Sequence, residues 1–138
     1  MGSAPHLEYE LASRAAGYQY VAGLDEAGRG AWAGPVVAAA VVLPLETADL
    51  CQLLSPVRDS KLLTSRQRDA CYDLVIEQAL AWSVGSSSPG SIDRKGIVAA
   101  TRRAMRQAVQ GLHRSVDRLL IDALDLQRVD LPQIAIPK

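Results

Sequence analysis

The sequence contains no phenylalanine, only two cysteines and no long hydrophobic run. Without phenylalanine, the core has to be built from Ala, Val, Leu and Ile, although apolar residues make up 49% of the 138. The apolar stretch Val36–Leu43 is far shorter than the ~18 residues that a membrane-spanning helix needs. The N-terminus also lacks the basic and then apolar pattern of a signal peptide. We therefore expect a soluble, cytoplasmic protein with no membrane segment.

Other residue types limit the kinds of site that the chain can build. Cys51 and Cys71 form no CxxC pair, which favours two reduced cysteines over a disulfide or a zinc site. His6 and His113 have none of the neighbours that a histidine-based catalyst needs, and both are interpreted as surface residues. The fifteen basic and fifteen acidic residues cancel. Any binding to nucleic acid would therefore have to come from local clusters of charge.

The length and periodicity of the chain indicate one α/β domain over residues 1–138. The predicted strands are Tyr18–Leu24, Val36–Leu43, Ala81–Ser86, Arg118–Asp122 and Gln133–Ile136. The first two are separated by a short connection, which favours an antiparallel pair. The second is continuously apolar and valine-rich, as expected of a strand that is buried on both faces.

Helices are predicted around these strands. Leu7–Ala16 is a short helix, and Pro44–Arg58 is a loop with up to one helical turn. Thr64 and Gln67 form a capping box at the start of a longer helix, and Ser86–Gly90 is a loop. The next helix has one apolar face, and Gly111 suits its end; the residues of that face are Ile97, Ala100, Thr101, Ala104, Met105, Ala108, Val109 and Leu112.

The most informative stretch is Asp25–Gly30, with the sequence DEAGRG. Two adjacent carboxylates repel each other, and half burying them at a strand end is costly unless a cation neutralises them. Hard divalent cations with oxygen ligands are the usual solution. Because successive side chains of a strand point to opposite faces, the strand must end or distort here for both acids to reach one metal. The alternative is a polar strand end with two solvated acids.

The glycines of this stretch favour close contact with a phosphate or a sugar, because backbone amides can approach where no side chain intervenes. Gly28, Gly30 and Ala33 also fit the G-x-G-x-x-A pattern of dinucleotide-binding proteins. That pattern requires a helix to start in the loop, whereas Pro35 and a β-branched run follow. We reject the dinucleotide interpretation and expect metal-assisted chemistry on a nucleic-acid backbone.

The segment from Tyr20 to Pro35, YVAGLDEAGRGAWAGP, resembles the signature of ribonuclease HII, the type 2 ribonuclease H family. Three further segments agree in order: Asp59–Leu63 (DSKLL), Ile92–Leu112 and Leu120–Asp122 (LID). The resemblance covers the chain from about Leu7 to its end. It implies a ribonuclease H-like fold, with a mixed five-stranded sheet flanked by helices.

The resemblance also implies the roles of single residues. Asp25, Glu26 and Asp122 would be catalytic carboxylates that bind Mg²⁺ or Mn²⁺, although Asp122 could instead be a turn-forming residue. The ribose beside the scissile bond would be read by the loop residues Gly28, Arg29 and Gly30. Lys61 would contact a phosphate near the site, with a solvated loop lysine as the alternative.

The basic residues of the helix region are a separate feature; they are Arg94, Lys95, Arg102, Arg103 and Arg106. Arg102 and Arg106 lie one turn apart and share a face. We interpret these residues as a solvated helix face, with contact to phosphates as the alternative.

The implied function is an endonuclease that hydrolyses the RNA strand of RNA–DNA hybrids, or cuts duplex DNA that contains ribonucleotides. The expected ends are a 5′-phosphate and a 3′-hydroxyl. The family has a fourth carboxylate and C-terminal helices, which would follow Lys138; without them we expect a weak catalyst and an exposed apolar face of the sheet. Ala31 and Ala123 replace a proline and a glycine of the family. Two alternatives stay open: a hybrid-binding module without turnover, and a module that docks a protein partner or a second copy over the bare face.

Overall fold

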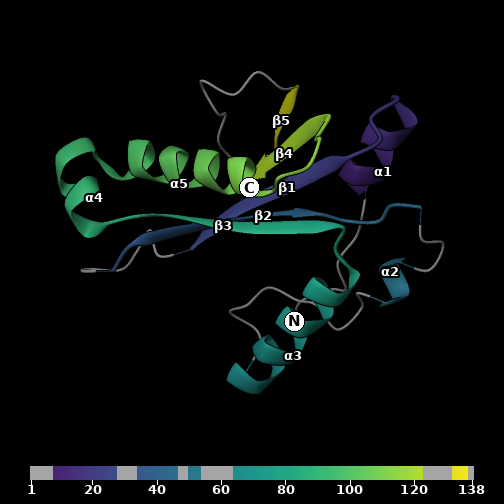
Figure 1. Cartoon of the computed structure of the whole chain (residues 1–138), viewed down its shortest axis with the longest axis horizontal. Helices are drawn as coiled ribbons and strands as arrows, with labels where there is room; N and C mark the ends of the chain where they lie inside the picture. Colours follow the sequence, from purple (N-terminus) through teal and green to yellow (C-terminus); the bar gives the residue numbers. More distant parts are fainter. Residues whose placement is uncertain (1–7, 28–33, 47–49, 54–63, 123–131, 137–138) are drawn as a thin grey trace.

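The computed structural model describes residues 8–27, 34–46, 50–53, 64–122 and 132–136. Its centre is a five-stranded sheet in the order β3-β2-β1-β4-β5. The strands are β1 (Val21–Ala27), β2 (Val36–Val42), β3 (Ala81–Ser87), β4 (Arg118–Asp122) and β5 (Gln133–Ile136). The helices are α1 (Glu8–Ala15), α2 (Leu50–Leu53), α3 (Ser65–Gln78), α4 (Pro89–Lys95) and α5 (Ile97–Gly111). Figure 1 shows α5 and α3 on opposite sides of the sheet.

The sheet is mixed, as the sequence predicts. β1 pairs antiparallel with β2, and β2 pairs antiparallel with β3. β1 and β4 are parallel neighbours, and so are β4 and β5. The α/β class and the antiparallel first pair are therefore confirmed. The parallel strands end at the same edge of the sheet, where a ligand site of an α/β protein commonly lies.

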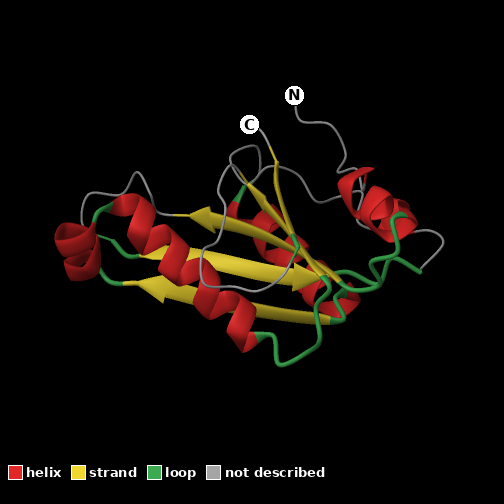
Figure 2. Cartoon of the chain, turned by 90° about the horizontal axis from the view of Figure 1, so that it is seen from above, coloured by secondary structure: helices red, strands yellow, loops and turns green. Residues whose placement is uncertain are grey.

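The core lies between the sheet and α5, which crosses the strands on one face (Figure 2). Alternate residues of β2 are fully buried there, as expected for a strand with one face on the core: Val36, Ala38, Ala40 and Val42. From α5, Ala104, Met105 and Ala108 meet them. Because small side chains dominate on both sides, helix and sheet approach closely.

Two glycines mark the closest approaches. A Cβ atom built on Gly85 of β3 would overlap the carbonyl oxygen of Ala104 and lie 2.8 Å from the backbone nitrogen of Ala108. At the C-terminal end of α5, a Cβ atom on Gly111 would overlap the hydroxyl of Ser83 in β3. Gly111 is the last residue of α5, so its predicted place at the helix end is confirmed. A side chain at this position would require the Ser83 hydroxyl of β3 to move.

The opposite face of the sheet is only half covered, so the prediction that the second strand is buried on both faces is wrong. Ala39 of β2 is exposed on that side. On β3, Trp82 and Val84 are 43% and 53% exposed. Tyr72 of α3 meets the ring of Trp82 edge-on, with 6.3 Å between the centroids. Apolar residues are thus exposed on this face among the described residues, next to α3, which has no buried residue of its own. Whether this is the face that the family's C-terminal helices would cover stays a prediction.

Helix α4 is a feature that the sequence analysis missed. The predicted loop over Ser86–Gly90 instead contains the end of β3 and the start of α4. The Ser88 hydroxyl accepts a hydrogen bond from the backbone N–H of Ser91, and Pro89 follows it at the first helical position. This is a standard helix start. Gly96, with φ of 87°, then separates α4 from α5.

The remaining local predictions agree with the described residues. The capping box of Thr64 and Gln67 is formed in both directions, and α2 is the single helical turn expected within Pro44–Arg58. His113 is exposed, as expected of a surface residue, and Cys71 is half-buried; His6 lies outside the described residues. No helix in the described part of the chain is long and apolar enough to span a membrane.

Candidate active site

Strand β1 runs through the acid pair without a break. It continues to Ala27, so Asp25 and Glu26 pair with Ala39 and Ala38 of β2. The prediction that the strand ends at Leu24 or distorts at the acids is therefore wrong. The physical reason lies in β2, because its extended apolar run offers backbone partners as far as Val37 and holds β1 in a regular ladder.

The two acids consequently belong to opposite faces of the sheet. Asp25 alternates with the core residue Leu24 and is exposed, on the same face as Ala39. Its Oδ1 accepts a hydrogen bond of 2.8 Å from the backbone N–H of Glu26, which fixes the carboxylate close to its own main chain. Glu26 faces the α5 side and is half-buried, with its Oε2 atom shielded from solvent.

Asp122 lies level with Asp25 in the neighbouring strand. The last pair of the β1–β4 ladder is Leu24 with Ile121, and each aspartate is the next residue of its strand. Parallel neighbours lie about 4.8 Å apart. The backbone positions of two carboxylic acids that are 97 residues apart in sequence are therefore adjacent at the carboxyl edge of the sheet.

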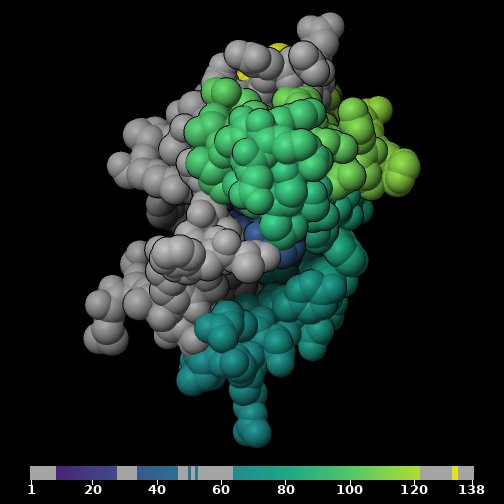
Figure 3. Space-filling model, turned by 90° about the vertical axis from the view of Figure 1, so that its left-hand side faces the viewer, coloured from purple at the N-terminus to yellow at the C-terminus, as the bar shows by residue number. Residues whose placement is uncertain are grey.

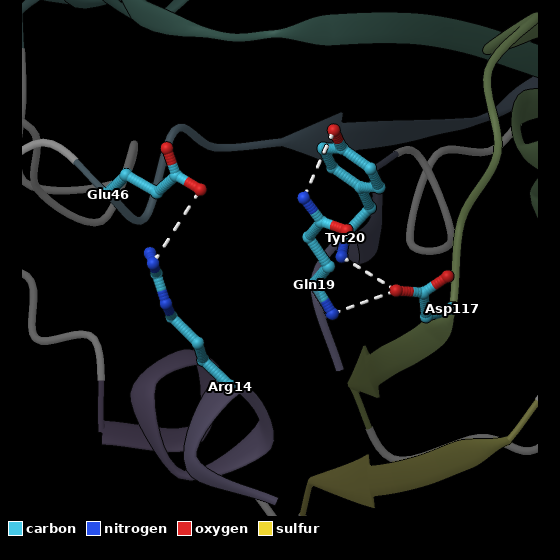
Figure 4. A network of polar contacts seen from close by, with 5 residues as sticks. All are labelled: Arg14, Gln19, Tyr20, Glu46 and Asp117. Atoms are coloured by element: carbon cyan, nitrogen blue, oxygen red, sulfur yellow. Dashed lines mark hydrogen bonds and ion pairs between the residues drawn. The ribbon is translucent and has the colours of Figure 1, made fainter. Parts of the chain in front are cut away.

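The register of these two strands is held at their opposite ends by Asp117. Its Oδ2 accepts hydrogen bonds from the backbone N–H groups of Gln19 (2.8 Å) and Tyr20 (3.1 Å), as Figure 4 shows. Its own N–H donates to the carbonyl oxygen of Tyr20 at 2.8 Å. The sequence analysis did not identify this role, because nothing local in the sequence signals a partner almost a hundred positions away.

Surface contacts surround this anchor. The guanidinium of Arg114 lies over the ring of Tyr20, 4.4 Å from its centroid. Arg14 and Glu46 form an exposed ion pair of 3.7 Å, which Figure 4 shows together with Gln19, Tyr20 and Asp117. An exposed pair of this kind adds little stability. The entry of β1 is therefore held mainly by the backbone hydrogen bonds to Asp117.

The donor chemistry of the site suits a hard divalent cation, because its candidate ligands are all carboxylates. Asp25 and Asp122 supply adjacent positions, whereas the regular strand turns Glu26 to the other face. Within the described part of the chain, no group of three or more His, Cys, Asp or Glu side chains is close enough to hold a metal ion. The described geometry therefore brings together two of the three predicted ligand positions.

The other predicted site residues lie outside the described residues. These are the loop residues Gly28, Arg29 and Gly30, and also Lys61. In the sequence, the loop residues follow Ala27, the last residue of β1. Their roles stay predictions.

Comparison with known families and proteins gives clear matches. The sequence model of the family described as Ribonuclease HII matches residues 22–135. A curated relative, the Ribonuclease HII of Roseiflexus castenholzii, is 50% identical over 137 residues, which is 99% of this chain. The match covers 61% of the relative, so the chain spans about three fifths of its length.

Solved structures agree in fold at lower identity. The ribonuclease H2 from Pyrococcus horikoshii OT3 matches with a TM-score of 0.71 and 24% identity, over 85% of this chain and 62% of that one. The RNase HII of a PCNA:RNase HII complex from Archaeoglobus fulgidus gives 0.69 and 23%, over 87% and 63%. Bst-RNase HIII in complex with Mn²⁺ gives 0.55 and 22%, over 86% and 41%. The ribonuclease H-like fold is thereby confirmed.

Proposed function

The chain belongs to the ribonuclease HII family, and we propose from this premise that it is the catalytic part of an endonuclease acting on RNA–DNA hybrids. The substrate would be the RNA strand of a hybrid, or a ribonucleotide within duplex DNA. Hydrolysis would leave a 5′-phosphate and a 3′-hydroxyl. Residues 1–138 would act as one domain.

One observation supports this proposal most strongly. Asp25 and Asp122 each follow the last paired residues of the β1–β4 ladder, Leu24 and Ile121, so their backbone positions are adjacent at the edge where the parallel strands end. Two carboxylates carried on adjacent backbone positions disfavour each other when both are charged, unless a cation compensates them. Such a pair is costly for a purely structural sheet edge and is useful for holding a divalent cation against a phosphate.

The residues have distinct roles in the proposed reaction. Asp25 and Asp122 would hold Mg²⁺ or Mn²⁺. Glu26 would be the third ligand if binding of the substrate or the cation changes the backbone at the end of β1, so that its side chain reaches the face of Asp25. When bound, the cation activates water and stabilises charge on the leaving oxygen. The hydrogen bond from the Glu26 N–H to Asp25 orients one ligand in advance.

Substrate recognition is assigned to the loop that continues β1. Gly28 and Gly30 would let backbone amides reach the 2′-hydroxyl of the ribose, which is the group that distinguishes RNA from DNA. Arg29 and Lys61 would contact phosphates on either side of it.

The apolar face formed by Tyr72, Trp82 and Val84 favours a second role, in protein contact. It borders an open hollow of about 350 Å³ between α3 and the outer face of β2 and β3. Exposed aromatic and β-branched residues at a hollow mark surfaces that another chain covers. Self-association or a protein partner would fill it, and gel filtration across a range of protein concentrations tests the first.

The catalytic proposal is tested by incubating the chain with a duplex that carries one ribonucleotide, in Mn²⁺ and in EDTA. Cleavage only with the metal, with a 5′-phosphate on one fragment and a 3′-hydroxyl on the other, is the expected result. Binding without cleavage would favour the alternative of a hybrid-binding module.

A further inference from the structure

Basic residues gather on α4 and α5 in a chain whose total charge is balanced. The two helices carry five basic residues and one acidic residue, Asp93, so the rest of the chain has more acidic than basic residues. We call the five the basic ridge: Arg94, Lys95, Arg102, Arg103 and Arg106. Helix α5 contains no carboxylate at all. A solvated helix face normally mixes both signs and pairs them one turn apart.

The topology places the basic ridge at the edge of the sheet that holds the candidate site. Ala27, at the end of β1, pairs with Val37, and the adjacent Val36 pairs with Ser87, the last residue of β3. Helix α4 begins two residues later, at Pro89. The ends of β1 and β3 and the start of α4 therefore share one edge, only two strand spacings, or about 10 Å, across.

Helix α5 starts from the same edge and runs back along β3. The Ser87 hydroxyl donates a hydrogen bond of 2.7 Å to the carbonyl oxygen of Ala100, in the first turn of α5. Further along, the Gln107 side chain accepts from the backbone N–H of Ser86 at 2.7 Å. Arg102 to Arg106 thus lie about 8 to 14 Å along the axis from the helix start, beside the last residues of β3.

The side chains of the basic ridge face away from the core. Arg103 is exposed, and Arg102 and Arg106 are half-buried. The opposite side of α5 is buried against the sheet through Thr101, Ala104, Met105 and Ala108. None of the described residues forms an ion pair with Arg94, Lys95, Arg103 or Arg106. Figure 3 faces this end of the molecule, where α4 and the start of α5 form the green prominence.

We propose that the basic ridge binds the phosphate backbone of the duplex next to the candidate site, whatever the sugar or the sequence. This inference rests on the proposed function for the identity of the duplex. A site edge lined by carboxylates repels the polyanion that it must bind, and a cluster of basic residues at the same edge compensates. Guanidinium groups suit phosphate oxygens because two N–H groups can donate to one phosphate.

Salt dependence of binding measures such contacts directly, because each neutralised phosphate contributes about 0.9 to the slope of log K against log [salt] for B-DNA. The experiment uses the 138-residue chain in EDTA, with fluorescence anisotropy of a labelled DNA duplex and a labelled RNA–DNA hybrid over a range of KCl. The variants are Arg103→Gln/Arg106→Gln and the charge-conserving Arg103→Lys/Arg106→Lys. The matched control is Arg66→Gln/Arg68→Gln, which removes two exposed arginines from α3 on the other side of the sheet.

The slope should fall by about one to two for the glutamine variant on both duplexes, and should stay unchanged for the control and nearly unchanged for the lysine variant. An unchanged slope in the glutamine variant, an equal fall in the control, or no binding by the parent chain would overturn the inference. A fall in the lysine variant as large as that in the glutamine variant would also contradict it, because the charge is retained. Cleavage is measured separately: binding through the basic ridge without cleavage in Mn²⁺ would refute the proposed function and leave this inference standing.

Discussion

Asp25 in β1 and Asp122 in β4 each stand one residue beyond Leu24 and Ile121, the last paired residues of two neighbouring parallel strands. This relationship joins the acid pair near the start of the chain to an acid close to its end. It is the geometric basis of the proposed metal site.

The first prediction concerns cation binding by this pair. Mn²⁺ should raise the melting temperature of the chain, because a ligand of the native state stabilises it by about 2.7 kcal/mol at a hundred times its dissociation constant. For a domain of this size, that is a rise of several degrees. The variant Asp25→Asn/Asp122→Asn should lose the rise, as measured by thermal melts with and without the metal.

The matched control is Asp69→Asn, an exposed acid on α3 that is not among the candidate ligands, which should keep the full rise. If the double variant shifts with Mn²⁺ as much as the parent chain does, the assignment of Asp25 and Asp122 as ligands is wrong.

The second prediction concerns the close contact of β3 with α5. Gly85→Ala should destabilise the fold by about 1–3 kcal/mol, because the added methyl would overlap the Ala104 carbonyl and lie 2.9 Å from Cβ of Gln107. Gly23→Ala in β1 is the control, since a Cβ there meets nothing within 4 Å. Urea denaturation midpoints compare the two, and equal midpoints would show that α5 does not pack as described.

The third prediction concerns the anchor at the far end of the ladder. Asp117→Ala removes the acceptor of two backbone N–H groups, those of Gln19 and Tyr20, and should cost about 1–3 kcal/mol of unfolding free energy. Asp117→Asn keeps an acceptor oxygen and should lose less. A stability of Asp117→Ala equal to that of the parent in urea would mean that the β1–β4 register has other support.

The fourth prediction concerns discrimination of sugars by the loop after β1. Gly30→Val would place a branched side chain where the 2′-hydroxyl is expected to approach, so binding to the hybrid should weaken more than binding to a DNA duplex. Anisotropy titrations of both duplexes measure this difference. Equal losses would indicate a purely structural loop.

Local patterns predicted the elements of this chain better than their ends. The capping box of Thr64 and Gln67 and the apolar periodicity of α5 depend on neighbours within one or two turns, and both are confirmed. The predicted end of β1 at Leu24 was wrong, because the length of this strand depends on β2. That strand comes later in the chain and extends the ladder past Asp25. Ser88 and Pro89 were taken as loop residues, although together they form a helix start.

The site could be predicted only in part for the same reason. The resemblance of Asp25 and Asp122 to family residues indicated that they belong together, and the parallel pairing of β1 with β4 gives the physical basis. No local pattern reveals that Asp117 holds the ladder. The convergence of Glu26 with the two aspartates stays a prediction, because alternation along a regular strand opposes it.

The most direct test of the account is single-turnover cleavage of a duplex with one ribonucleotide, in Mn²⁺ and with the chain in excess, so that slow catalysis is detected. The parent chain and Asp69→Asn should cleave at the ribonucleotide at the same rate. Asp25→Asn should be slower by about a thousandfold or more, because the loss of a metal ligand removes several kcal/mol of transition-state stabilisation. Cleavage by Asp25→Asn at the parent rate, or no metal-dependent cleavage by the parent chain, would contradict the proposed active site.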